Sequence, residues 1–449
     1  MAALLARLRG EVTLSYPAWE ACEGRTLSPS SLMLQAYRKV EAHPHAGFDD
    51  MERALGNPLS RIPRGTRRLD REDVWLGVLY RHGRLLDGEA ALRACFPWLA
   101  AGIEAHAERM GETVGRHHGV VAPRPGLDPR VDDTVVLSSS RLEALGSCPL
   151  RYYYRYVLGV RPADDPSCDP ERWLDALQKG SLLHTVYDRV LREARHRRVA
   201  PDDERFLEHA LVVLEELVDG MRLEVPPPSR TMYEHELKEL REDVTLFVGM
   251  IRADLPDWEA TELRFGFDDT VLPAVELTLS SGAVIRLRGA IDRVDSLPSG
   301  SLRVVDYKTG SPFQLSTTTV WNAGRRLQHM LYSEAAEQLL HRPVDRMEYH
   351  FPTRKGKNER SRFRRTELRE GLTLLDHMLD IVSTGHFVPT EDAADCRFCD
   401  FRDACRVPVN SYGQIDPSFQ ERASRRQNDP AYAEFQLVRQ FRDRVGNSS

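Results

Sequence analysis

The pattern of apolar residues divides the chain into two parts. Over the first 130 residues, apolar side chains recur three or four positions apart, which is the spacing of one buried face of an α-helix, so we expect this region to be mostly helical. The helical stretches are 33–40, 73–86 and 89–110. One early strand is predicted at 11–17. The segment 120–133 is rich in Pro, Gly and Asp, which predicts a linker.

After residue 131, helical patterns alternate with strand patterns. Serines at 138–140 offer an N-cap for a first helix. Further helices are predicted at 180–198, 204–221, 325–340 and 368–382. Runs of β-branched and aromatic residues between turn sequences predict strands at 258–268, 274–281, 283–296, 301–310 and 345–352. This order predicts an α/β fold, and the polar remainder carries one predicted helix at 430–444.

Two of these strands form a hairpin with an unusual set of charges. A turn centred on Ser299 in the sequence LPSGS places Asp292 opposite Asp306. Like charges that face each other destabilise a sheet, so two partly desolvated carboxylates need a proton, a cationic side chain or a metal ion. Lys308 lies on the same strand face as Asp306, two positions further on. The hairpin therefore ends either in a solvated surface ion pair or in a cation site.

The second interpretation has a definite chemistry. Two carboxylates and a backbone carbonyl, here that of Tyr307, form a hard oxygen site that suits Mg²⁺ or Mn²⁺. A neighbouring lysine, here Lys308, can orient a water molecule or stabilise negative charge on a phosphoryl group. Together these groups are the equipment of metal-assisted phosphodiester hydrolysis.

Five short motifs occur together along the chain. They are GSLLHTVYDRVL with His184, TELRFGF with Glu262, GAIDRVD with Asp292, VVDYKTG with Asp306 and Lys308, and RLQHMLY with Gln328 and Tyr332. In this order they resemble the motifs of the PD-(D/E)XK nucleases, in particular the RecB-like and AddB-like branch, over about residues 137–406. The resemblance implies a restriction-endonuclease-like core, in which helices flank a central mixed sheet.

The resemblance also implies a role for each motif residue. The expected catalytic residues are Asp292, Asp306, Lys308, Gln328 and Tyr332. The expected metal ligands are His184, Asp292, Asp306, Glu262 and the carbonyl group of Tyr307. Because RecB-like enzymes act on single strands or on DNA ends, DNA in one of these forms is the expected substrate.

Taken alone, several of these residues have ordinary explanations. His184 lies at the edge of an apolar helical arc, where a histidine is often a satisfied boundary residue. Gln328 and Tyr332 are four positions apart and project from one side of a helix, as a polar pair beside an apolar stripe also would. Glu262 can equally be a solvated strand position. The hairpin and the order of the motifs favour the functional interpretation.

The seven cysteines include a close triplet near the C-terminus. The spacing of Cys396, Cys399 and Cys405 suits either zinc or an iron–sulfur cluster, and an odd cysteine count in a long chain argues against a disulfide framework. In the AddB-like branch a Cys-Pro at the domain start, here at Cys148, joins such a triplet around a [4Fe–4S] cluster. The resemblance therefore implies a structural [4Fe–4S] cluster that closes a very long loop, with zinc as the alternative. The other cysteines, Cys22, Cys95 and Cys168, are expected to be free thiols.

A basic stretch at 354–365 is the main candidate for contact with nucleic acid. Its expected DNA-binding residues are Arg354, Lys355, Lys357, Arg360, Arg362, Arg364 and Arg365. With Phe363 among them, the stretch could follow a DNA backbone. A solvated hairpin with no ligand is the alternative. Because the formal net charge of the chain is -6, any nucleic-acid binding depends on such local patches.

Other features bear on the setting of the protein. No Walker A pattern is present, so we expect no ATP hydrolysis by this chain, and a separate helicase or ATPase subunit is an expected partner. Residues 12–33 resemble the end of the helicase-like region of AddB-like proteins. No apolar run reaches the length of a membrane span, and the first 14 residues lack the apolar core of a signal peptide, so no membrane contact and a cytoplasmic location are expected.

Together these features predict three regions. They are a mostly helical region at 1–130, which contains the helicase-like remnant, a nuclease domain with its cysteine site at 131–408, and a polar tail at 409–449. The main hypothesis is a Mg²⁺- or Mn²⁺-dependent deoxyribonuclease. The alternatives are a non-catalytic DNA-binding or scaffold subunit with a structural cluster, and an interaction protein held together by zinc.

Overall fold

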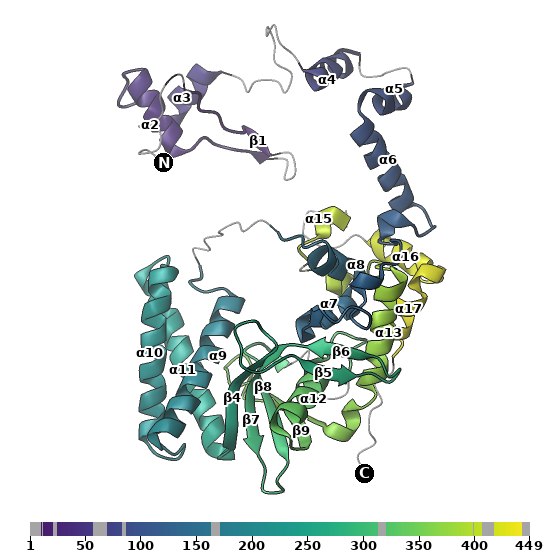
Figure 1. The fold of residues 1–449 in the computed structure, drawn as a ribbon. Coiled ribbons are helices and arrows are strands. Elements are labelled where there is room, and N and C mark those ends of the chain that lie inside the picture. Colours follow the sequence, from purple (N-terminus) through teal and green to yellow (C-terminus); the bar gives the residue numbers. More distant parts are fainter. Residues whose placement is uncertain are drawn as a thin grey trace. The chain divides into compact units, whose positions relative to one another are not determined.

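The computed structural model describes residues 10, 12–20, 25–56, 70–82, 87–162, 171–312, 320–397, 399–405 and 417–441 (Figure 1). These fall into two compact units, one formed by 1–106 with 411–413 and the other by 107–410 with 414–449. Each unit is described by itself. No helix among the described ranges combines the length and the apolar composition that crossing a membrane requires.

The first unit is mostly helical, as predicted. Its helices are α2 (Ser31–Val40), α3 (Phe48–Leu55), α4 (Arg71–His82), α5 (Gly88–Cys95) and the start of α6 (Pro97–Met110). The side chain of Ser30 accepts a hydrogen bond from the backbone N–H of Met33 and so caps α2. Pro97 separates α5 from α6 because proline lacks a backbone N–H and is tolerated only in the first turn of a helix.

The early strand predicted at 11–17 is wrong. Residues 12–17 have no regular structure, and the only pairing described in this unit joins β1 (Trp19–Glu20) to β2 (Arg25–Thr26). A strand needs a partner for its backbone N–H and C=O groups. Among the residues that the structure describes, that partner lies opposite Trp19–Glu20 and not opposite the predicted stretch.

The second unit is built on a five-stranded mixed sheet of order β10-β9-β8-β7-β4. The strands are β4 (Asp257–Phe265), β7 (Gly289–Ser296), β8 (Leu302–Tyr307), β9 (Val344–His350) and β10 (Arg360–Arg364). Within this sheet, as far as the structure describes it, β8 and β9 are the one parallel pair, and α12 (Gln328–Leu340) lies between them in the chain. A smaller sheet of order β3-β6-β5 joins β3 (Val136–Leu137), β5 (Val275–Thr278) and β6 (Val284–Leu287).

Helices flank the main sheet, so the predicted fold class is confirmed (Figure 1). One core joins β8 residues Val305 and Tyr307 to α9 (Ala176–Arg197), α10 (Arg205–Glu224) and α11 (Arg230–Asp254). The other core joins Leu302 and Val304 to α12 and α13 (Gly371–Thr384). Successive β8 residues enter different cores because strand side chains alternate between faces.

Strand β10 lies in the predicted basic stretch and was not predicted as a strand. Three further departures concern a strand, a helix and the predicted linker. The strand predicted at 283–296 is two strands in two sheets, separated at Arg288. A Cβ on the next residue, Gly289, would lie 2.9 Å from the ring of Tyr332, so glycine is needed where the chain passes close to α12. Helix α11 was not predicted, although its buried Leu240, Val244 and Phe247 lie four and three positions apart.

The third departure concerns the predicted linker. In segment 120–133, Arg130 forms ion pairs with Asp128 at 2.9 Å and with Asp380 of α13 at 2.8 Å. Val120 also forms a bridge with His386. The segment is therefore packed onto the second unit.

Short helices complete this unit. They are α7 (Ser139–Ser147), α8 (Pro149–Tyr152), α14 (Ala393–Cys396), α15 (Arg402–Cys405), α16 (Pro417–Arg426) and α17 (Ala433–Arg439). The predicted N-cap of α7 is confirmed, because the Ser138 hydroxyl accepts a hydrogen bond from the N–H of Arg141. The predicted C-terminal helix corresponds to α17, which packs on the larger core through Phe435 and Val438.

Candidate metal centre

The candidate site lies where β7 and β8 separate. The predicted register of this hairpin is confirmed, since Arg293 pairs with Val305 and Val294 with Val304. Asp292 and Asp306 follow at the next facing positions. The Oδ2 atom of Asp292 accepts a hydrogen bond of 2.6 Å from the N–H of Tyr307, which fixes this carboxylate at the mouth of the hairpin.

Helix α9 brings His184 to this carboxylate. Asp175 caps the helix, and its buried Leu183, Val186 and Tyr187 hold it against the sheet. The Nδ1 atom of His184 lies 3.3 Å from Oδ1 of Asp292. Burial opposes a charge on the imidazole, but the interaction with Asp292 outweighs it and raises the pKa of His184 to about 9.

Glu262 reaches the same place from β4 on the other side of β7. Its backbone has a φ of 44°, in the left-handed region that non-glycine residues seldom adopt inside a strand. Such strained residues concentrate at functional sites, where the surrounding structure holds them. Burial and the charge of Asp292 raise the pKa of the Glu262 carboxyl to about 7.

These three side chains can offer ligand atoms to one ion. One ligand atom each from His184, Glu262 and Asp292 lies within 4.8 Å of the other two. Carboxylate oxygens with one imidazole nitrogen form a donor set that suits Mg²⁺ or Mn²⁺. A cation there would offset the repulsion between the two carboxylates, which is the physical reason for placing them together.

Lys308 and Asp306 form the second half of the site. The Nζ atom of Lys308 lies 2.6 Å from Oδ2 of Asp306 and donates a hydrogen bond of 2.7 Å to Oε1 of Gln328. Burial raises the pKa of Asp306 although Lys308 opposes that shift. Asp306 in turn raises the pKa of Lys308 against the effect of burial. The lysine is therefore held charged at a defined place.

Helix α12 supports the pair of Lys308 and Asp306 through a hydrogen bond with the lysine. Gln328 is its first residue, and Tyr332 lies one turn later, where burial raises the pKa of the phenol although hydrogen bonding to Gln328 opposes the shift. Of the predicted pair of polar residues, Gln328 contacts Lys308, and Tyr332 contacts Gln328. Sequence analysis missed Glu143 of α7, whose Oε1 atom accepts hydrogen bonds from the N–H groups of Leu327 at 2.8 Å and Gln328 at 3.1 Å.

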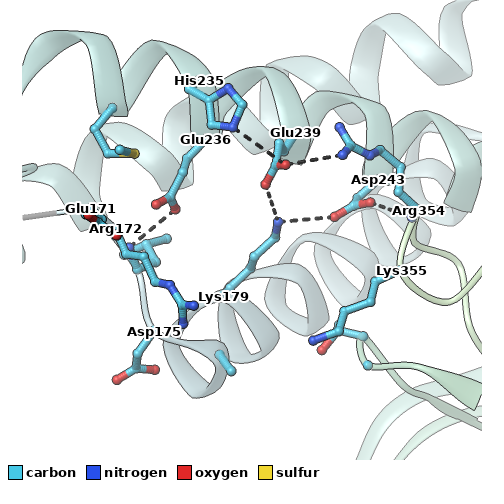
Figure 2. Close-up of a pocket in the computed structure, with 15 residues that line it drawn as sticks. Glu171, Arg172, Asp175, Lys179, His235, Glu236, Glu239, Asp243, Arg354 and Lys355 are labelled. Carbon is cyan, nitrogen blue, oxygen red and sulfur yellow. Dashed lines mark hydrogen bonds and ion pairs between the residues drawn. The ribbon is translucent and has the colours of Figure 1, made fainter. Parts of the chain in front are cut away.

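A cavity of about 730 Å³ opens beside the candidate metal ligands. His184 and Glu262 line it, together with small and hydroxyl-bearing residues such as Gly180, Ser181 and Thr309. A second cavity, of about 650 Å³, also borders Thr309 (Figure 2). Two of the candidate metal ligands, His184 and Glu262, are therefore accessible from a large cavity.

The basic stretch has a mixed arrangement. Arg354 lies 2.7 Å from Glu242 and 3.3 Å from Glu239, and Figure 2 shows it turned toward Glu239. The other paired arginines are Arg360 with Asp254, Arg362 with Glu348, and Arg365 with Glu334 and Glu337. Lys355 lines the second cavity, and Lys357 and Arg364 are exposed. Phe363 is buried in the core and is not part of the exposed surface of the stretch.

The structure also contains a buried charge network that sequence analysis missed. Arg293 and Asp295 lie 2.8 Å apart, and Arg303 lies 2.8 Å from the same aspartate. Arg293 donates a hydrogen bond to the Tyr307 hydroxyl, which anchors the residue between Asp306 and Lys308. Charged residues within strands were the available signal, but strand position alone does not reveal which charges are buried.

The four predicted cysteines come from separate segments of the second unit. Cys148 lies between α7 and α8, Cys396 ends α14, and Cys405 ends α15, with Cys399 between the last two helices. Burial raises the pKa of Cys148 to about 11, and burial with repulsion from Cys148 and Cys399 raises that of Cys396 to about 12. Burial and repulsion from the other three thiols also raise the pKa of Cys405. The thiols thus affect one another electrostatically, but among the described residues no three of their sulfur atoms lie within 4.8 Å of one another.

Cys95 lies in α5 of the first unit, while Cys22 and Cys168 fall outside the described residues.

Comparison with known proteins agrees with this geometry. Residues 136–406 match the family model of the PD-(D/E)XK nuclease superfamily. The chain is 27% identical over 211 residues to a subunit of the ATP-dependent helicase/deoxyribonuclease from Clostridioides difficile, and 30% identical over 206 residues to the corresponding protein from Ruminiclostridium cellulolyticum. Each match covers 44% of this chain but 17% of the relative, so the chain matches about a sixth of the length of these proteins.

The family match and the site describe the same part of the molecule. The matched segment is more than half of the 449 residues and contains every metal-ligand candidate, the lysine and all four cysteines of the predicted cluster. The chain belongs to the PD-(D/E)XK nuclease superfamily.

Proposed function

We propose that this protein is a deoxyribonuclease that hydrolyses phosphodiester bonds with Mg²⁺ or Mn²⁺. The observation that carries the proposal is the convergence of His184, Glu262 and Asp292 within 4.8 Å. It is strengthened by the charged Lys308 next to Asp306, because a lysine near bound metal can stabilise a phosphoryl group. Family membership supports phosphodiester hydrolysis as the reaction class.

The side chains have distinct roles in this proposal. His184, Glu262 and Asp292 hold the cation, with Asp306 and the carbonyl group of Tyr307 as further ligands. A bound divalent cation supplies an activated water and offsets charge on the phosphate.

The remaining residues act around that centre. Lys308 orients the attacking water or stabilises charge on the transferring phosphoryl group. Gln328 holds the lysine, and Tyr332 supports Gln328 from the next helical turn. The basic residues with exposed side chains, such as Lys355 and Lys357, contact the DNA backbone.

DNA ends or single strands are the proposed substrate. The cavity beside the metal ligands, about 730 Å³ in volume, has room for a nucleotide of an entering strand. The names of the relatives include both helicase and deoxyribonuclease, which supports DNA as the substrate and a separate helicase as a partner. In this proposal the enzyme works in the cytoplasm in DNA repair, recombination or defence against phage.

The four cysteines are proposed to bind a structural [4Fe–4S] cluster. Cys148, Cys396 and Cys405 have raised pKa values because buried thiolates lack compensation, and an iron–sulfur cluster or zinc ion would supply the missing positive charge. Iron and sulfide analysis of anaerobically purified protein distinguishes the two occupants. Replacement of Cys396 by Ser should remove the bound iron, and retention of stoichiometric zinc without iron would contradict the cluster.

The activity is tested by incubating the purified chain with end-labelled single-stranded and double-stranded DNA. We expect cleavage with Mg²⁺ or Mn²⁺ and none with EDTA, and the choice of labelled end also reports polarity. An absence of cleavage of both substrates under both metals, by protein that is folded and carries its cysteine-bound metal, would contradict the proposed function.

A further inference from the structure

The first turn of α12 is held by residues outside the proposed catalytic set. The first N–H groups of a helix have no partner within it. Here one carboxylate oxygen of Glu143 accepts two of the hydrogen bonds at that end, from Leu327 and Gln328. Its negative charge also faces the positive end of the helix dipole. Glu143 therefore fixes the point at which α12 begins.

The position at which α12 begins determines where Lys308 is held. Gln328, the first residue of α12, accepts a hydrogen bond of 2.7 Å from the lysine Nζ atom. The same nitrogen lies 2.6 Å from Asp306. If the first turn of α12 moved, Lys308 would keep Asp306 and lose the partner that sets its direction.

Arg325 holds the same turn from the preceding residues. Its Nε and Nη2 atoms donate hydrogen bonds to the two carboxylate oxygens of Asp395, at 2.8 and 2.7 Å. Asp395 is well buried and also accepts hydrogen bonds from Thr390 and Arg439. This two-bond contact fixes the direction of the guanidinium group as well as its position.

Both anchors belong to segments that carry cluster cysteines. Glu143 of α7 precedes Cys148 by five residues, and Asp395 directly precedes Cys396. Thr390 connects the two segments, because its N–H donates a hydrogen bond of 3.4 Å to the Cys148 sulfur while its hydroxyl binds Asp395. A change in the spacing of these cysteine segments would therefore move the two anchors of α12 relative to each other.

We infer that Glu143 and Arg325 are positioning residues that couple the four-cysteine site to Lys308 through Gln328. The inference rests on the proposed nuclease function. It adds a connection between the four-cysteine site and the reacting centre. In this connection, an intact four-cysteine site keeps Lys308 in its orientation.

The Glu143 half of this coupling is tested in the full chain with Glu143→Ala and Glu143→Gln. The alanine variant should lower single-turnover cleavage at saturating DNA by about tenfold or more, because small displacements of a catalytic group are costly. DNA affinity measured with Ca²⁺ should stay within about twofold, since no DNA contact is removed. Glutamine can still accept both N–H groups and should restore most of the rate. The control is Glu337→Ala, which removes an acceptor of the Val344 N–H at the other end of α12.

A double variant separates positioning from general destabilisation. If Glu143 acts through Gln328, the pair Glu143→Ala and Gln328→Ala should cleave about as fast as Gln328→Ala alone. The inference would be overturned if the loss of cleavage rate in the double variant equalled the product of the two single losses, or if Glu143→Ala cleaved at the wild-type rate. Either result would leave the nuclease proposal intact. A wild-type chain that cleaves no DNA would instead contradict the nuclease proposal.

The Arg325 half has a readout that needs no activity. Because coupling is reciprocal, Arg325→Ala should increase the rate at which a thiol reagent modifies Cys148 and Cys396 in metal-free protein. Arg130→Ala is the matched control, since Arg130 also joins an irregular segment to a helix, through Asp380 of α13, and pairs with a second carboxylate, that of Asp128. Equal thiol reactivity in Arg325→Ala, Arg130→Ala and wild type would overturn the coupling to the cysteine site.

Discussion

Two charged regions of the second unit arrange their charges in opposite ways. At the mouth of the β7–β8 hairpin, carboxylates from separate strands converge, and burial together with the charge of Asp292 raises the pKa of Glu262 to about 7. In the basic stretch at 354–365, most arginines are already paired with carboxylates of the same unit, as Arg354 is with Glu242. The comparison shows that unbalanced buried charge, and not a high density of charge, marks the site where a ligand is needed.

The largest expected effect comes from removing the lysine or its partner at the hairpin. Lys308→Ala and Asp306→Asn should each reduce cleavage by on the order of 10³-fold, because charge stabilisation at the reacting phosphate is lost. Folding and DNA affinity should remain close to wild type, as measured by thermal melting and by fluorescence anisotropy. Asp257→Asn, at the exposed start of β4, is the control. Near-normal cleavage by both Lys308→Ala and Asp306→Asn would contradict the assignment of the hairpin charges to a catalytic site.

The next effect concerns the strained residue of β4. Glu262→Gln should weaken Mn²⁺ binding by about tenfold or more, since it removes one charged ligand from the group. Glu259→Gln, in the same strand but paired with Arg342, should leave metal affinity unchanged. Calorimetric titration of both variants measures the difference. Equal affinities for the two variants would exclude Glu262 as a ligand.

A smaller effect is expected in the pH dependence of the metal-free protein. The pKa of Glu262 rises from 4.5 to about 7 on folding and that of His184 from 6.5 to about 9. The folded state therefore binds more protons than the unfolded state over this range, so the free energy of unfolding falls as the pH rises from about 5 to 9.

This dependence is measurable as a melting temperature in EDTA at a series of pH values. We expect the melting temperature of the wild type to fall by a few degrees relative to that of Glu262→Gln between pH 5 and pH 8. Saturating Mn²⁺ should remove most of the difference between pH values, because the ion replaces the protons. If the difference in melting temperature between the wild type and Glu262→Gln stayed constant with pH, the raised pKa of the Glu262 carboxyl would be contradicted.

The smallest effects are expected in the basic stretch, and they should divide by ion pairing. Lys355→Ala should weaken DNA binding about twofold to fivefold and lower the salt dependence by about one charge. Arg360→Ala should instead lower the free energy of unfolding by about 1–2 kcal/mol, because Asp254 loses a partner, with little effect on DNA affinity. Anisotropy at several salt concentrations and chemical denaturation measure the two quantities. If Arg360→Ala weakened DNA binding and Lys355→Ala lowered the free energy of unfolding, ion pairing would not decide which residues bind DNA.

The sequence predicted the hairpin well because local rules determine it. The turn at Ser299 sets the register, and the alternation of side chains then brings Asp292 opposite Asp306 and puts Lys308 on the same face as Asp306. The α/β class followed from the same periodicity. The residue roles assigned through the family resemblance remain proposals for the experiments above.

Other features depend on contacts between segments distant in the chain. The strand predicted at 283–296 divides between two sheets because Arg288 and Gly289 meet β3 and Tyr332, which no local pattern reveals. The role of Glu143 depends on α12, more than 180 residues later. The burial of Phe363 and the pairing of the arginines around it likewise follow from neighbours across the sheet.

The central claim is that Asp292, Glu262 and His184 hold the metal ion that DNA cleavage requires. The most direct measurement compares Mn²⁺ binding and cleavage of end-labelled single-stranded DNA in the wild type and in Asp292→Asn, at the same pH and ionic strength. The wild type should bind Mn²⁺ and cleave, and the variant should lose both together while melting at a similar temperature. Cleavage that persists in Asp292→Asn with unchanged Mn²⁺ affinity would contradict the account.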